Sequence, residues 1–111
     1  MAIVERYTSP DGLLELLVDL TAGDWTIGFA GIPGHTHGDF LAKTRGGTVE
    51  SAVRDFIDDV INSRGVIVIT RIDGKIRAVD VPDDPTGDYT KYAVPNETIE
   101  KRYWNGRPFT G

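Results

Sequence analysis

Cysteine is absent from this chain of 111 residues, and histidine occurs only twice. The lack of cysteine excludes disulfide bonds, thiolate zinc ligands and cysteine nucleophiles. Long hydrophobic runs are missing as well, because charged residues interrupt each apolar stretch before it reaches the length of a membrane span. The first residues do not show the pattern of a signal peptide. We therefore expect a cytoplasmic protein that does not bind membranes.

Basic residues are outnumbered: 12 Lys and Arg stand against 17 Asp and Glu, and the formal net charge is −5 at pH 7. This balance argues against a nucleic-acid partner, because phosphate backbones are bound by clustered Lys and Arg. It favours a basic protein partner instead. The hydrophobic share of 40% is ordinary for a globular protein. The length fits one domain over residues 1–111.

Three apolar or alternating segments occupy residues 3–7, 13–20 and 25–30, separated by the turn-forming sequences SPDG and TAGD. Proline fixes φ and glycine permits positive φ in such turns. This part of the chain therefore predicts a three-stranded antiparallel meander.

A second hairpin is predicted where residues 66–71 and 75–81, both rich in β-branched side chains, flank Asp73-Gly74. An Asp-Gly pair favours the type I′ turn, which needs positive φ at both central residues. Residues 66–70 of the first run, VIVIT, are continuously apolar, so we expect a central strand that is covered on both faces or nearly so.

Residues 48–63 contain the clearest helix signal. Thr48 is suited to cap the N-terminus, and Gly65 to end the helix. The apolar side chains follow the i, i+3, i+4 spacing that forms one stripe along a helix. They are Val49, Ala52, Val53, Phe56, Ile57, Val60 and Ile61.

The C-terminal segment, residues 89–111, contains five of the ten aromatic residues and more basic than acidic residues. We expect it to pack back on the domain and to add a last strand. The order β-β-β-α-β-β, with this additional strand, predicts an α+β two-layer sandwich. In this arrangement one amphipathic helix packs on a mostly antiparallel sheet of five or six strands. One helix does not cover so wide a sheet, so part of it should stay open for binding.

Both histidines lie in the sequence GIPGHTHGDF, within a segment from Gly31 to Gly47 that reads as a long loop. His35, His37 and Asp39 resemble the start of the His-x-His-x-Asp-His motif of metallo-β-lactamase-fold hydrolases. Phe40 replaces the next histidine of that motif and no third histidine exists, so we do not assign the chain to this family. A small metal-dependent hydrolase with these three ligands, suited to Zn²⁺, is the alternative function. The preferred interpretation is a polar turn without a cofactor.

The outer face of the predicted helix carries Asp55, Asp58 and Asp59 in its second half. The negative end of the helix dipole disfavours acids there, although Arg54 is placed to pair with Asp58 one turn later. We expect these acids, with Tyr103 and Trp104, to contact a basic partner. The sequence thus favours a noncatalytic protein-binding module, for instance an immunity-type inhibitor that neutralises a basic toxin or nuclease.

Overall fold

The computed structural model describes residues 3–89 and 94–110. Seven strands and two helices follow one another along these residues. In chain order they are β1 (Ile3–Thr8), β2 (Glu15–Thr21), β3 (Asp24–Phe29), β4 (His35–His37), α1 (Gly38–Arg45), α2 (Val49–Ile61), β5 (Ile67–Ile72), β6 (Lys75–Asp80) and β7 (Glu97–Arg102). Neither helix in this described part combines the length and the apolarity needed to cross a membrane.

The strands form two antiparallel sheets, so the α+β class is confirmed but the single sheet of five or six strands is wrong. One sheet has the order β1-β2-β3-β4, and the other has the order β6-β5-β7. The reason lies in the strand edges. The short strand β4 occupies the free edge of β3, while β6 and β7 flank both sides of β5. The outer edges of β1, β6 and β7 pair with no other described strand, so backbone pairing does not link the two sheets.

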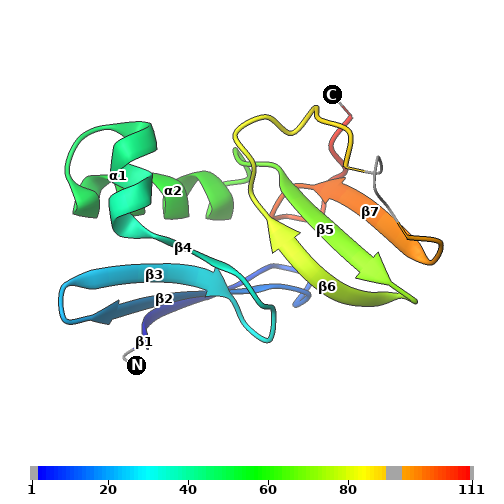
Figure 1. Ribbon diagram of the computed structural model, residues 1–111, viewed down its shortest axis with the longest axis horizontal. Helices are drawn as coiled ribbons and strands as arrows, with labels where there is room; N and C mark the ends of the chain where they lie inside the picture. The colour runs from blue at the N-terminus through cyan, green and yellow to red at the C-terminus, as the bar shows by residue number, and fades with distance from the viewer. Residues whose placement is uncertain (1–2, 90–93, 111) are drawn as a thin grey trace.

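The segment between Gly31 and Gly47, expected as a loop, contains β4 and α1. Strand β4 is held by backbone pairing with β3. A strand of three residues is too short to show the alternating apolar and polar pattern that would predict it. Helix α1 buries only Gly38 and Leu41, so the sequence shows no apolar stripe there. Both helices lie on one side of the four-stranded sheet, and the other side of that sheet carries no helix (Figure 1).

Helix α2 confirms the predicted helix and ends slightly earlier, at Ile61. Thr48 caps it, because its hydroxyl accepts a hydrogen bond from the Ser51 backbone N–H at 3.1 Å. Ser63 adopts a φ of 58°, which stops the helix before Gly65. The predicted apolar stripe is the buried face, apart from the two end residues, Val49 and Ile61, which are not fully buried.

The predicted hairpin turn between β5 and β6 is confirmed. Asp73 and Gly74 have φ values of 53° and 79°, so both central residues adopt the positive φ of a type I′ turn. The prediction of a covered central strand is confirmed too, because Ile67, Val68 and Ile69 of β5 are all buried. Since successive side chains point to opposite faces, both faces of β5 are covered.

One cluster of buried side chains connects the two sheets. Its members come from the segment between β1 and β2, from β2, β3, both helices and β5, and from the segment after β7, where Trp104 lies. Helix α2 contributes the most, and it lies over the four-stranded sheet with its C-terminal end directed toward the start of β5 (Figure 1). The chain thus buries one apolar core between the helices and two sheets rather than between one helix and one sheet.

Candidate functional site

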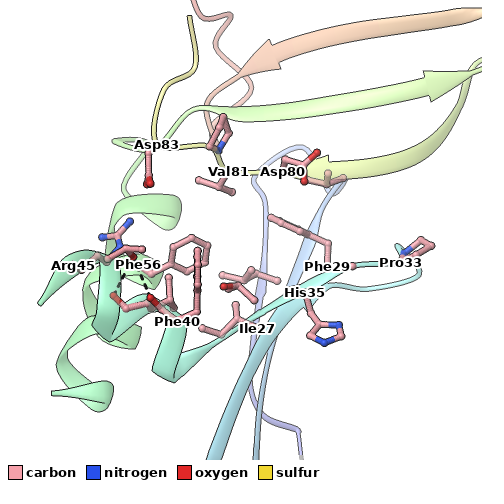
Figure 2. Close-up of a pocket in the computed structure, with 18 of the residues that line it drawn as sticks. Ile27, Phe29, Pro33, His35, Phe40, Arg45, Phe56, Asp80, Val81 and Asp83 are labelled. Carbon is pink, nitrogen blue, oxygen red and sulfur yellow. Dashed lines mark hydrogen bonds between the residues drawn. The ribbon is translucent and has the colours of Figure 1, made fainter. Parts of the chain in front are cut away.

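The two histidines share the face of β4 that is turned away from the helices. His35 and His37 pair with Gly28 and Thr26 of β3, whereas the core residue Ile27 pairs with the intervening threonine. Their ring centroids are 4.7 Å apart, in an edge-to-face arrangement. The His35 ring points away from the apolar side chains behind the strand (Figure 2). The histidines therefore belong to an outer sheet surface rather than to a loop.

Of the three proposed metal ligands, the structure brings the two histidines together but not Asp39 with them. Asp39 lies in the first turn of α1, where its Oδ1 accepts a hydrogen bond from the Phe40 backbone N–H at 2.9 Å. The nearest acid to His37 is Asp24, whose Oδ2 lies 3.6 Å from Nδ1. Across residues 3–89 and 94–110, no three His, Asp or Glu side chains are placed to hold a metal ion.

We expect Zn²⁺ to bind this chain no more tightly than micromolar, because a catalytic zinc site needs three protein ligands and the imidazole pair supplies two. Isothermal titration calorimetry of the wild type and of His35→Ala measures this directly. A submicromolar affinity that His35→Ala abolishes would contradict the expectation and favour the hydrolase alternative.

Among the three helix acids, Asp59 has a structural role. Its carboxylate accepts hydrogen bonds from Arg45 at 2.8 Å and from Arg64 at 3.0 Å. The bond from Arg45 is the main reason that the pKa of Asp59 lies below its usual range. Asp59 therefore connects the end of α1 to α2, and its charge is largely neutralised within the chain.

Asp55 and Asp58 remain exposed, and neither carboxylate forms an ion pair among the described residues. The predicted partner Arg54 bonds Glu5 of β1 instead, with a distance of 2.7 Å from Nη1 to Oε1 and a second bond from Nη2 to Oε2. This bidentate bond lowers the pKa of Glu5. Arg54 thus fixes α2 on the sheet and leaves the charge of Asp58 directed at solvent.

The two aromatic candidates behave differently. Trp104 is only 4% exposed and lies in the core, so its indole is not part of the exposed surface. Its position after β7 directs the indole inward, which an aromatic-rich sequence alone does not reveal. Tyr103 is half-buried, packs edge-to-face on Phe109 with ring centroids 6.3 Å apart, and carries Arg107 over its ring at 5.1 Å. Residues 90–93 of the same segment lie outside the described residues.

A cleft of about 540 Å³ opens between the four-stranded sheet, α1 and the end of β6. Sequence reasoning missed it. Figure 2 shows side chains from these elements facing one another across it. Its apolar walls include Ile27, Phe29, Leu41, Phe56, Val79 and Val81. Its volume lies within the range typical of ligand-binding pockets, roughly 300–1,000 Å³.

Charged groups line the mouth of this cleft. Arg45 lies over the Phe56 ring at 5.4 Å and is neutralised by Asp59. Asp80 and Asp83 also line the cleft, and neither forms an ion pair with any residue that the structure describes. Figure 2 shows the Asp83 carboxylate pointing toward the side where Arg45 and Phe56 lie. The cleft therefore combines apolar walls with an excess of negative charge at its mouth.

Tyr89 lines the same cleft beside the acidic segment of residues 80–88. Its hydroxyl donates to the Asp84 backbone carbonyl at 3.1 Å. Burial, with the nearby Asp84 and Asp80 carboxylates, raises the pKa of Tyr89. The acidic sequence PDDPTGD was the one available signal for this cleft, but it indicated only a break between strands.

Comparisons with protein-family models, with curated proteins and with solved structures give no significant match.

Proposed function

We propose that this chain is a noncatalytic module that binds a basic protein, as an immunity-type inhibitor does when it covers the active site of a toxin or nuclease. The observation that carries the proposal is the pair Asp55 and Asp58, which are exposed on the outer stripe of α2 and form no ion pair within residues 3–89 and 94–110. Two acids kept free on an otherwise well-formed helix are suited to attract a basic partner over a distance.

The placement of these acids lowers the local stability of the helix. Asp58 lies in the last turn of α2, near the negative end of the helix dipole, where an acid costs about 0.3–1 kcal/mol. The last turn of α2 contains no basic residue to offset this. Asp55 and Asp59 also lie at i, i+4, but the bonds of Asp59 to Arg45 and Arg64 reduce the repulsion between the two carboxylates. A binding role explains why the helix carries them.

The net charge supports the same partner class. At −5 the chain repels nucleic acid and anionic membrane surfaces and attracts basic proteins. A cysteine-free chain is compatible with a reducing compartment, and the cytoplasm is the location that we propose with this function.

We expect Asp55→Asn/Asp58→Asn to associate with the basic partner several-fold more slowly at low salt, because electrostatic steering acts mainly on the association rate. The dissociation rate should change much less. The partner is first isolated by affinity capture with the wild-type chain, and association is then measured by stopped flow across a salt series. Thermal unfolding should show the variant as stable as the wild type or slightly more so.

The matched control is Asp73→Asn/Glu97→Gln, which removes the same charge at the far end of the three-stranded sheet (Figure 1). Its association rate should stay close to that of the wild type. Equal rates for all three proteins at every salt concentration would show that the outer stripe of α2 is only solvated, and would overturn this proposal.

A further inference from the structure

We infer that the cleft between the two sheets binds an arginine or lysine side chain of the basic partner, together with apolar residues next to it. This inference rests on the proposed function and assigns a second contact to it. Three observations carry it: the apolar walls, the unpaired carboxylates at the mouth, and the position of the cleft beside α2.

The apolar walls require an occupant with apolar surface. Phe40 is 58% exposed although it lines the cleft, and the next residue, Leu41, is buried at its base. Phe40 therefore extends the apolar lining of the cleft to the exposed surface of α1. The long aliphatic stem of arginine or lysine, or an apolar neighbour of such a residue, would cover these walls.

The carboxylates determine the charge of the occupant. An apolar or anionic ligand would remove water from Asp80 and Asp83 without giving either a partner, and an uncharged donor would bond them more weakly than a cation does. A guanidinium or ammonium group would pair with them. Arg45 does not oppose such a cation strongly, because its charge is already neutralised by Asp59 at 2.8 Å.

The position of the cleft connects it to the proposed interface. Phe56 of α2 is one of its walls, so the cleft and the outer stripe are two faces of the same helix. Val81, another wall, lies beside Gly65 just after α2: a Cβ built on Gly65 would lie 3.4 Å from Val81 Cγ1 and 3.7 Å from the Asp59 backbone oxygen. One protein surface that reaches over the end of α2 would meet both.

The test is an amide NMR titration of the full ¹⁵N-labelled chain with the acetylated, amidated peptide LRFRL. A second peptide carries citrulline in place of both arginines, which keeps the shape and removes the charge. We expect the arginine peptide to shift amide signals of cleft residues such as Leu41, Thr44 and Val81. The citrulline peptide should bind about tenfold more weakly, because it loses the charge-assisted hydrogen bonds.

Two pairs of variants locate the contact. Asp80→Asn/Asp83→Asn should lower the affinity for the arginine peptide about as much as the replacement of both arginines by citrulline does. Asp55→Asn/Asp58→Asn should retain most of the wild-type affinity. Thr44 is exposed on α1 and lines the cleft, so Thr44→Trp should fill the mouth and abolish binding. Lys43→Trp places the same side chain one residue away, outside the cleft, and should bind normally.

The inference fails if the arginine peptide shifts no cleft signals at millimolar concentration, if both peptides bind equally, or if Thr44→Trp and Lys43→Trp behave alike. These outcomes are separate from a failure of the proposed function. A chain that binds the peptide in the cleft but captures no basic protein retains the cleft site and loses the proposed function. If a basic partner is captured through Asp55 and Asp58 but no peptide binds in the cleft, the proposed function stands and the cleft site is lost.

Discussion

Asp11→Asn is expected to lower the free energy of unfolding by about 2–4 kcal/mol, although Asp11 lies in a turn between two strands. Its Oδ2 accepts a hydrogen bond at 2.7 Å from Nη1 of Arg102, at the end of β7. The Arg102 side chain is only 4% exposed, whereas that of Asp11 is 41% exposed. Removing the carboxylate leaves a buried guanidinium without its counter-charge, and the partial exposure of Asp11 keeps the loss below that of a fully buried pair.

The pair also joins distant parts of the chain. Asp11 Oδ1 accepts bonds from the Ser9 hydroxyl at 2.7 Å and from the Leu13 backbone N–H at 3.1 Å, so the β1–β2 turn is built around it. Arg102 also donates to the backbone carbonyls of the two residues that follow it. The ion pair therefore holds the turn of the first sheet against the last strand of the second.

The pH dependence identifies the cause. The hydrogen bond from Arg102, followed by those from Ser9 and Leu13, holds the pKa of Asp11 well below its usual range. A carboxyl whose folded pKa is depressed contributes stability that is complete above its unfolded pKa, about 3.9, and that disappears as the pH falls through the folded pKa. The difference between wild type and Asp11→Asn should therefore be constant from pH 5 to 8 and shrink below about pH 4.

Glu15→Gln is the matched control for this prediction, since Glu15 pairs with Arg6 at 3.0 Å but both side chains are exposed to 36% or more. Such surface pairs contribute about 0.2–1 kcal/mol. Urea unfolding of the three proteins across the pH range is the measurement. Equal losses for the two variants, or a loss for Asp11→Asn that does not vary with pH, would show that the buried pair does not stabilise the fold.

This ion pair illustrates what a single sequence does not reveal. Helix α2 and the Asp73-Gly74 hairpin are encoded by neighbouring residues, through apolar spacing and turn preference, and both were predicted. Asp11 and Arg102 are separated by 91 positions, and no local pattern links them. The same limit explains why Arg54 was assigned to Asp58 within its own helix rather than to Glu5 on β1.

The candidate site was less predictable than the fold because the cleft is made by packing. Its walls come from β3, α1, α2 and the end of β6, and each apolar side chain alone looks like part of the core. The inward position of Trp104 and the separation into two sheets are likewise consequences of tertiary packing. Exposure of acids on α2 was predictable, because residues opposite an apolar helix stripe face solvent.

Helix α1, which the sequence pattern did not indicate, depends on the absence of a side chain at its first residue. A Cβ built on Gly38 would lie 2.7 Å from Val49 Cγ1, 2.9 Å from Trp25 Cβ and 3.2 Å from Val53 Cγ2. Two of these atoms belong to short, stiff valine side chains, and the third is next to the backbone, so none moves away easily. Gly38 therefore lies where α1, α2 and β3 pack closely against one another.

Gly38→Val is accordingly expected to lower the free energy of unfolding by about 3 kcal/mol, since overpacking a closed contact costs about 1–3 kcal/mol and sometimes more. Gly38→Ala should lower the free energy of unfolding by less, and this variant should stay folded with α1 displaced. Because α1 carries Phe40, Leu41 and Thr44 of the cleft, the alanine variant should also shift their amide NMR signals. Thermal and urea unfolding measure the first effect, and the NMR spectrum of the folded variant measures the second.

Gly87→Val separates the steric cause from the general cost of replacing glycine. A Cβ at Gly87 would meet its nearest atom, at the end of the Tyr89 ring, at an ordinary 3.6 Å. This control should change stability by no more than about 0.5 kcal/mol, as surface substitutions do. If Gly38→Val lowers the free energy of unfolding no more than Gly87→Val does, α1 is not held tightly against α2 and β3. The cleft that α1 borders then has no fixed wall. A large and specific loss at Gly38 means instead that the cleft is preformed, so that a partner does not have to order it on binding.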